Sequence, residues 1–188
     1  MQEKYLVDES FEQVTNLAKA TYENCVFNNG NLLEKNLSEI TFIDCIFNNC
    51  DISLANLHKT VLRDVQFNNC KLLGVRFDSC NQFGLSFSFN DCIINHASFY
   101  KTNIKKTIFK NSSLIEVDFM EADLSGAQFL YCNLQNAHFE NTNLEKADFS
   151  TAYNYSLDPE LNRIKRAKFA ISGIAGLLEK YQIIIDNQ

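Results

Sequence analysis

Large apolar residues recur at every fifth position over most of this chain. The series begins at Leu17 and reaches Phe77 without an exception, and after a shift of two residues it resumes at Phe89 and runs to Phe149. A period of five fits neither an α-helix, with 3.6 residues per turn, nor a flat strand, which alternates every two residues. The pattern therefore predicts a chain that turns a corner after every five residues, with the large residue pointing inward.

Two further regularities define the shape of the predicted coil. The residue two positions before each large one is small at almost every repeat, and the other three positions are mostly polar. Residues twenty apart are also of one kind, as expected if four corners close each coil. We therefore predict an all-β fold, a quadrilateral parallel β-helix of about seven coils with four pentapeptides in each. One column consists of phenylalanine alone: Phe27, Phe47, Phe67, Phe89, Phe109, Phe129 and Phe149.

The stacked columns predict how the coils hold together. Phenylalanine rings one coil apart are expected to stack along the axis. The triplet Phe-Asn-Asn recurs at 27–29, 47–49 and 67–69 and predicts asparagine ladders on the outside of the coils. The chain has a single proline, as expected where nearly every residue donates a hydrogen bond from one coil to the next.

The repeat divides the chain into three segments. Residues 1–16 precede the repeat and are expected to cap the first coil, and residues 17–154 form the solenoid. The shift of two residues falls near 81–88 and predicts a bulge. Residues 155–188 are expected to form a C-terminal cap, because the open end of a solenoid exposes unpaired strands.

The C-terminal segment predicts a short α-helix followed by a strand. Ser172 is placed to cap the helix, whose apolar residues recur at i, i+3, i+4 and i+7, and residues 182–185 are typical of a strand. This segment either covers the last coil only or also forms a homodimer contact, since it carries more apolar surface than one end needs. The residues expected at a homodimer contact are Ile174, Leu177, Leu178, Tyr181, Ile183 and Ile185.

Composition narrows the possible functions. The chain has 188 residues, of which 46% are hydrophobic, enough for one domain with a core, and its net charge is −6. A general nucleic-acid-binding protein carries a basic surface, so no direct nucleic-acid binding is expected. The chain contains neither the roughly 18 consecutive apolar residues of a membrane span nor the pattern of a signal peptide. We expect a cytoplasmic protein that does not enter membranes.

Candidate chemistry is sparse along the chain. All seven cysteines fall at the small inward position, which indicates packing rather than redox chemistry, and their spacings differ from those of zinc sites. The three histidines, His58, His96 and His138, fall at outward positions far apart. The sequence has no glycine-rich phosphate loop, and a convex rod predicts no obvious pocket. We expect a binding protein without catalytic residues, metal or cofactor, and not an enzyme.

Negative charge gathers near the end of the repeat. Residues 112–150 contain seven acidic residues and one basic residue, Lys146. These acids form either an ordinary solvated surface or a column of carboxylates that resembles the phosphates of DNA. Lys101 is expected to lie one coil from Glu121, which weakens the field there. The candidate partner-binding acids, which map to two adjacent faces of the last coils, are Asp118, Glu121, Asp123, Glu140 and Glu145.

The repeat resembles that of the pentapeptide repeat proteins, whose consensus is A(D/N)LXX. Residues 122–126 (Ala-Asp-Leu-Ser-Gly) and 147–149 (Ala-Asp-Phe) match it closely, and the resemblance covers about residues 17–152. It implies a right-handed quadrilateral β-helix. The tail at 177–181 (Leu-Leu-Glu-Lys-Tyr) and the break at 83–87 (Phe-Gly-Leu-Ser-Phe) are similar to those of the Qnr, MfpA and McbG group of this family.

The resemblance to this group implies a function as well as a fold. Its members are dimeric, DNA-like acidic rods that bind DNA gyrase or topoisomerase IV and protect them from quinolones or a peptide toxin. The chain would then be a homodimer through its C-terminal segment. Qnr proteins also project loops, where the two extra residues here predict only a bulge. The alternative is a structural scaffold that binds an unrelated protein.

Overall fold

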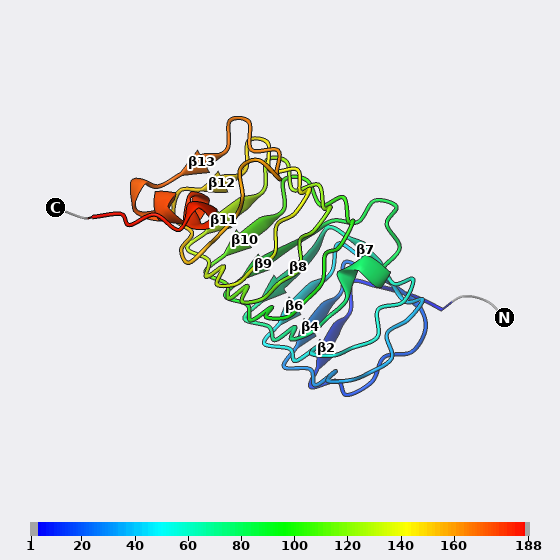
Figure 1. Ribbon diagram of the computed structural model, residues 1–188. Helices are drawn as coiled ribbons and strands as arrows, with labels where there is room; N and C mark the ends of the chain where they lie inside the picture. The colour runs from blue at the N-terminus through cyan, green and yellow to red at the C-terminus, as the bar shows by residue number, and fades with distance from the viewer. Residues whose placement is uncertain (1–3, 187–188) are drawn as a thin grey trace.

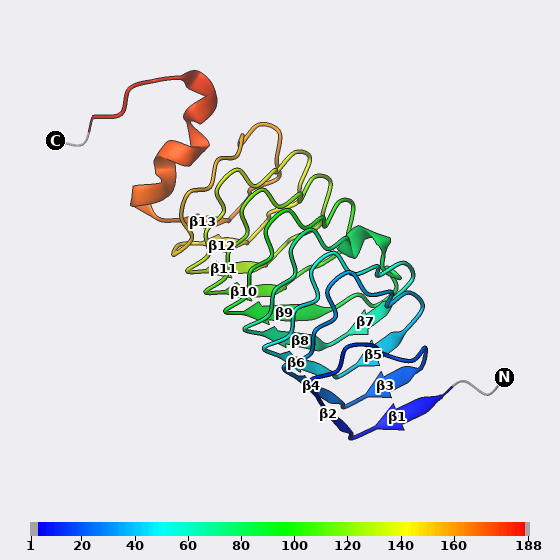
Figure 2. The same cartoon turned by 90° about the horizontal axis from the view of Figure 1, so that it is seen from below.

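The protein is a rod of stacked coils (Figure 1). The computed structural model describes residues 4–186 and contains short strands joined by tight corners. All strand pairs are parallel, as a coil that returns in the same direction on every turn requires. Figure 2 shows the coils in sequence order, with β1 at one end and the C-terminal helices at the other. The predicted all-β parallel β-helix is confirmed.

Two sheets run along the rod. The first covers only the N-terminal half and contains β1 (Tyr5–Val7), β3 (Thr21–Glu23), β5 (Thr41–Ile43) and β7 (Val61–Arg63). The second runs the whole length as a nine-stranded sheet. Its strands are β2 (Ser10–Glu12), β4 (Val26–Asn28), β6 (Ile46–Asn48), β8 (Val65–Asn68), β9 (Phe87–Asn90), β10 (Ile108–Lys110), β11 (Gln128–Leu130), β12 (Asp148–Phe149) and β13 (Lys168–Phe169).

The register of these strands places residues of one column directly above one another. Phe27 pairs with Phe47, twenty residues on, whereas Phe67 pairs with Phe89, twenty-two residues on. The column extends at both ends, because Phe11 pairs with Phe27 and Phe149 with Phe169. The rod is therefore longer than the predicted seven coils. Residues 1–3 of the expected N-terminal cap and residues 187–188 of the C-terminal cap lie outside the described residues.

Four faces surround the axis, and we number them by the large inward residue that each holds in one coil. Phe109 marks the first face, Leu114 the second, Phe119 the third and Leu124 the fourth. All four side chains are fully buried. Rings of the first face stack at centroid distances of 5.3 Å for Phe89–Phe109 and 5.1 Å for Phe109–Phe129, and they meet rings of the third face edge-on. The predicted aromatic stack is thus the axis of the core.

The corners between faces adopt left-handed backbone conformations. Asn29, Asn49 and Asn69 have φ between 51° and 55°, and each of these residues ends one straight segment. The corner amide of Asn29 donates to the carbonyl of Asn48 in the next coil at 2.9 Å. Such bonds offset the strain of left-handed backbone, so that even Lys106 occupies a corner with φ 60°.

Side chains reinforce the stacking from inside and outside. Asn48 donates to Asn28 at 2.9 Å and accepts from Asn68 at 3.0 Å, so the predicted asparagine ladder is present. All seven cysteines are buried, as their positions in the repeat predict. The thiol of Cys50 donates to the carbonyl of Phe27 at 3.4 Å, and that of Cys70 donates to the carbonyl of Phe47 in the same way. The thiols therefore take part in coil-to-coil bonding.

The frame shift is absorbed by a bulge beside the short 3₁₀ helix η1 (Phe77–Ser79). Phe87 turns inward and contacts the ring of Phe77 at a centroid distance of 5.1 Å. Phe83 points outward, is 78% exposed and lies over the guanidinium of Arg63 at 5.5 Å. Gly84 makes this reversal possible, since its φ of 69° is left-handed. The two extra residues thus form a bulge rather than a long loop.

The C-terminal end differs from the predicted α-helix and strand. It contains two 3₁₀ helices, η2 (Ile171–Leu177) and η3 (Glu179–Tyr181), and Ser172 does not cap them. Residues 182–186 form no strand. Two glycines within η2 weaken an α-helix, and Gln182 ends η3 with a left-handed φ of 50°. We refer to residues 171–186 as the C-terminal module. No helix within residues 4–186 has the length and apolar character of a membrane span.

Candidate interaction site

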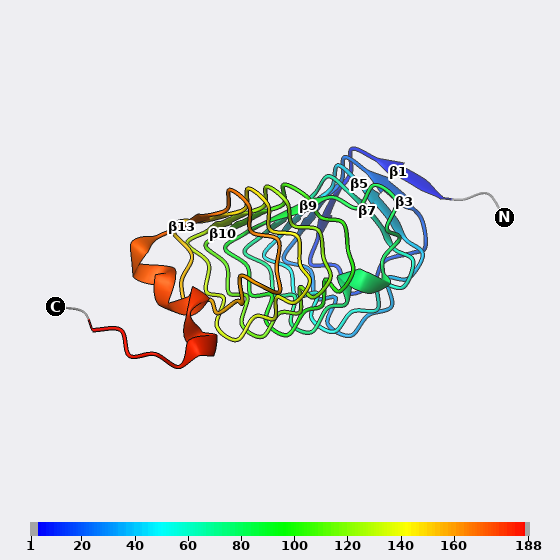
Figure 3. The same ribbon diagram turned by 45° about the horizontal axis from the view of Figure 1, so that its top comes forward.

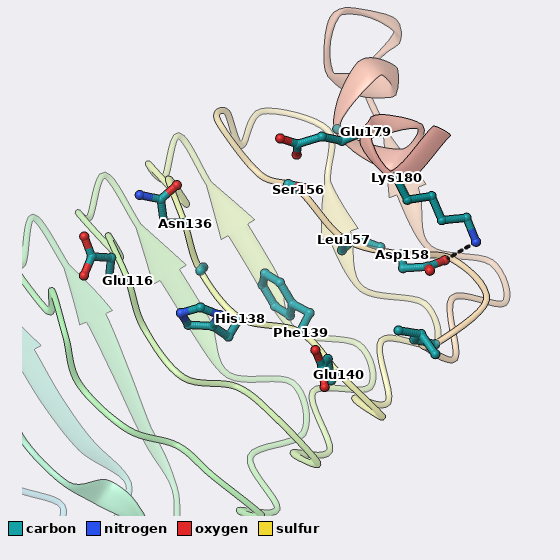
Figure 4. A pocket seen from close by; sticks show the side chains of 13 residues that line it. Glu116, Asn136, His138, Phe139, Glu140, Ser156, Leu157, Asp158, Glu179 and Lys180 are labelled. Carbon is teal, nitrogen blue, oxygen red and sulfur yellow. Dashed lines mark hydrogen bonds and ion pairs between the residues drawn. The ribbon is translucent and has the colours of Figure 1, made fainter. Parts of the chain in front are cut away.

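A groove separates the third face of the last coils from the C-terminal module (Figure 4). Its volume is about 670 Å³. The C-terminal module lies against the end of the rod (Figure 3). The prediction that the rod offers no pocket is wrong here, because residues of the module and of the last coils line this groove together. The residues that line the groove are Glu116, Asn136, Ala137, His138, Phe139, Glu140, Ser156, Leu157, Asp158, Leu161, Gly176, Glu179 and Lys180.

Tyr155 seats the C-terminal module against the last coil. Its side chain is 5% exposed and contacts the rings of both Phe149 and Phe169, which stack on each other. A methyl group on Gly173 would overlap the Tyr155 hydroxyl, and one on Gly176 would overlap the Tyr155 carbonyl oxygen. The amide of Leu157 donates to the carbonyl of Gly176 at 3.0 Å. The two glycines are therefore required for close approach.

An ion-pair cluster fixes the far end of the module. The ammonium group of Lys180 contacts Asp158 at 2.7 Å and Glu160 at 2.6 Å. The hydrogen bonds that Lys180 donates lower the pKa values of both carboxyls, and these carboxyls in turn raise the pKa of Lys180. Tyr181 also donates to Glu160 at 3.2 Å. One lysine faces two carboxylates, so the cluster keeps a net charge of −1.

Three of the five predicted partner-binding acids are paired with cations. Glu121 lies 3.3 Å from Lys101, as the twenty-residue spacing predicts, and also accepts a hydrogen bond from Tyr100. The two acids on the fourth face have cations close by as well. Asp123 lies 3.3 Å from Lys105, and Glu145 lies 2.8 Å from Arg163. The negative field over the fourth face is therefore weak.

Asp123 is the most strongly held of these acids. Partial burial pushes the pKa of its carboxyl up, but hydrogen bonds from Ser125, Asn143 and Lys105 outweigh burial and leave the pKa below its usual range. Its carboxylate accepts from the Ser125 amide and from the Asn143 side chain at 3.0 Å each. This carboxylate has a structural part in the coil and little capacity for a partner.

Asp118 and Glu140, the remaining two, lie on the third face. Neither has an ion pair among residues 4–186. Asp118 pairs in register with His138, and Glu140 lines the groove. Glu179, across the groove on the module, is also exposed and without an ion pair in the described chain. Sequence spacing did not reveal Glu179 as a site residue, because its place depends on how the module docks.

The six residues predicted for a homodimer contact divide into two kinds. Ile174, Tyr181, Ile183 and Ile185 are 41–55% exposed, whereas Leu177 and Leu178 are half-buried, and Leu177 packs against the core of the rod. Two residues outside the prediction are the most exposed apolar side chains of the module. Ile171 is 93% exposed and Ile184 is 96% exposed. In the predicted strand, Ile184 would point to the opposite side from Ile183 and Ile185, so it was not among the predicted contact residues.

The geometry defines a solenoid of stacked pentapeptide coils with a grooved, acidic third face. A family model for the pentapeptide repeat region matches residues 20–88 and 85–153. The chain belongs to the pentapeptide repeat family, whose members form right-handed β-helices. A comparison with curated protein sequences finds no match.

Solved structures with the same fold include two trypsin-treated variants of QnrB1, a plasmid-mediated fluoroquinolone resistance protein. One is 19% identical with a TM-score of 0.64 and covers 98% of both chains. The other is 18% identical with the same TM-score and covers 99% of this chain and 100% of its own. HetL from the cyanobacterium Nostoc, involved in heterocyst differentiation regulation, is 18% identical over 89% of this chain and 84% of its own, with a TM-score of 0.37.

Proposed function

We propose that this protein binds DNA gyrase or topoisomerase IV in the place of DNA. The observation that carries the proposal is the likeness to the fluoroquinolone resistance protein QnrB1, which covers 98% of both chains and so extends beyond the repeat. Binding, not catalysis, is the activity proposed. Protection against quinolones is a separate and more specific part of the proposal. Qnr proteins project loops, whereas only a bulge interrupts the coils here.

The third face is the proposed contact with the enzyme. Asp118, Glu140 and Glu179 present carboxylates that no cation of the described chain neutralises. A topoisomerase holds DNA through lysine and arginine side chains, which make charge-assisted hydrogen bonds to phosphate and to carboxylate alike. The groove adds the apolar side chains of Leu157 and Leu161 to this surface. A cationic side chain with an aliphatic stem therefore fits it.

The C-terminal module is the proposed homodimer contact. Its exposed isoleucines and Tyr181 form an apolar surface beyond the last coil, beside a second groove of about 520 Å³ lined in part by Leu178 and Ile183. A second copy that covers this surface would extend the rod to about twice its length. Ile183→Glu combined with Ile185→Glu is expected to give a monomer in light scattering. Ile108→Glu, at a residue 40% exposed on the first face, is the control.

A supercoiling assay with purified gyrase, with and without ciprofloxacin, tests the proposed function. We expect the protein to inhibit supercoiling or to restore it in the presence of the drug. Glu140→Lys combined with Glu179→Lys should weaken this effect by at least about tenfold, the result of losing roughly 1.4 kcal/mol. Glu34→Lys combined with Asp64→Lys changes the net charge equally on other parts of the rod and should keep it. No effect of the wild-type protein at micromolar concentrations would refute the proposal.

A scaffold for an unrelated protein is the second candidate, and one surface favours it. Leu33, Leu54 and Leu73 lie on or beside the second face of successive N-terminal coils and are 37–56% exposed. Leu54 also packs over Gly74, so the patch is continuous across coils. Serine at all three leucines would abolish binding of a scaffold partner and leave the gyrase assay unchanged.

A further inference from the structure

One edge of the rod is positively charged, although the chain as a whole carries a net charge of −6. This edge lies between the fourth and the first face. It is diagonally opposite the edge of Glu116 and Asn136, which line the acidic groove. Along its C-terminal half, the corner residues with left-handed backbone are Lys106, Gly126, Lys146 and Arg166. In the N-terminal half, they are Asp8, Asn24, Asp44 and Asp64. Charge is therefore segregated along this edge.

We refer to Lys106, Lys146, Lys165 and Arg166 as the basic edge. All four side chains are exposed, and none has an ion pair within residues 4–186. The acids beside them are already neutralised. Asp123 and Glu145 are paired with Lys105 and Arg163, and Asp148 is paired with Lys168 at 3.2 Å. The four cations therefore keep their charge for a partner.

A hollow of about 240 Å³ lies within the basic edge at Gly126. Lys106 and Lys146 line it from the coils on either side, about 10 Å apart at the usual spacing of two coils. A methyl group on Gly126 would meet only the stem of Lys106, at 3.5 Å, so the corner between the lysines is open. A phosphate group placed there would lie between these two lysines. Asp123 and Glu145 also line the hollow, but each is already paired with a cation.

We propose that the basic edge binds the phosphate backbone of duplex DNA. Its cations form a line about 15 Å long from Lys106 to Arg166, at three coil spacings. Contacts between proteins contain little lysine and depend on apolar anchor residues. Contacts with phosphate use lysine and arginine and need no apolar anchor. Three of the four cations here are lysine. The expectation of no nucleic-acid binding rested on net charge, which hides this segregation.

This inference goes beyond the proposed binding to a topoisomerase. A rod that presents carboxylates on its third face and cations on the diagonal edge can touch the enzyme and a DNA segment together. The contact is with phosphates only, so it carries no sequence preference. Because salt weakens the attraction between these few cations and phosphates, binding is expected only at low salt.

Fluorescence anisotropy of a labelled 20-base-pair duplex tests the basic edge without any enzyme. The full chain is expected to bind at 50 mM salt, with a slope of log K against log salt of about −3.6 for four neutralised phosphates. Lys106→Glu combined with Lys146→Glu should lower the affinity by at least about tenfold and reduce the slope by about 2. Lys59→Glu combined with Lys71→Glu makes the same change in net charge elsewhere, and Lys59 is also a left-handed corner.

Three outcomes would overturn the inference. The first is no salt-dependent binding by the wild-type chain at 50 mM salt. The second is an equal loss of affinity in the control variant, which would mean that net charge alone decides binding. The third is tighter binding to a poly-glutamate peptide than to the duplex, which would assign the basic edge to an acidic protein. The supercoiling assay does not depend on these variants, so the two proposals can fail separately.

Discussion

Replacing Gly176 with alanine is expected to detach the C-terminal module and leave the rod intact. The added methyl group would overlap the carbonyl oxygen of Tyr155 and lie 3.0 Å from its carbonyl carbon. Tyr155 cannot retreat, because it is buried against the rings of Phe149 and Phe169. The module must move instead.

The cost follows from what the module loses. Overpacking of this kind costs about 1–3 kcal/mol, and the hydrogen bond from the Leu157 amide to the Gly176 carbonyl is worth about 1 kcal/mol. Opening of the module should therefore become easier by about 2–4 kcal/mol. At 1.4 kcal/mol for each factor of ten, hydrogen exchange at the Leu157 amide should accelerate by about 30- to 1,000-fold.

The matched control is Gly126→Ala. Gly126 is a left-handed corner with open space around it, and lysines occupy the same corner in neighbouring coils at φ 60° and 62°. This variant should leave exchange at Leu157 unchanged. If exchange at Leu157 is as slow in the Gly176→Ala variant as in the wild type, the glycine does not seat the module, and the reasoning is refuted.

Three further predictions concern the rod. Phe109→Ala removes a fully buried ring between two stacked neighbours and should lower the free energy of unfolding by about 3–5 kcal/mol in urea titrations. Asn48→Ala breaks the ladder on both sides and should cost about 1–2 kcal/mol by the same measurement. The lowered pKa of Asp123 stabilises the fold above the unfolded value of about 3.9 and loses this effect as the pH falls through the folded value. Asp123→Asn should therefore flatten the fall in stability between about pH 5 and pH 2.

Each of these predictions has an outcome that would contradict it. A cost below about 1 kcal/mol for Phe109→Ala would mean that the aromatic axis can be repacked. Ser88→Ala, on the same sheet and without a ladder bond, is the control for Asn48→Ala, and equal costs would remove the ladder from the account. An unchanged pH profile in the Asp123→Asn variant would show that its hydrogen bonds do not favour the charged carboxylate.

The core could be predicted from the sequence because burial in this fold repeats at a fixed interval. The five-residue period places each large residue, and the twenty-residue period places its neighbour in the next coil. Phe27 above Phe47 and Asn48 above Asn28 both follow from this arithmetic. The inward position of the cysteines follows in the same way, so their number does not indicate redox chemistry.

The C-terminal module could not be predicted in the same detail. The spacing of Ile174, Leu177 and Tyr181 is typical of an α-helix, but the backbone there forms 3₁₀ helices. The reason is a tertiary contact, since the close approach of Gly173 and Gly176 to Tyr155 decides the path of the chain. For the same reason, the groove between module and third face was invisible in the sequence.

The acidic faces were only partly predictable. Counting charges along residues 112–150 finds the acids but misses cations that lie one coil away and outside that window. Lys105, Arg163 and Lys168 neutralise Asp123, Glu145 and Asp148 in this way. In a solenoid, the local charge depends on residues that stack in neighbouring coils, so charges have to be added over residues about twenty apart.

Competition with DNA for gyrase tests the central claim most directly. Gyrase is first bound to a fluorescent duplex, and the unlabelled protein is then added while the anisotropy of the DNA is followed. The account predicts that the protein displaces the duplex and that Glu140→Lys combined with Glu179→Lys displaces it at least about tenfold less well. Duplex that stays bound to gyrase at every micromolar concentration of the protein would contradict the claim that its third face takes the place of DNA.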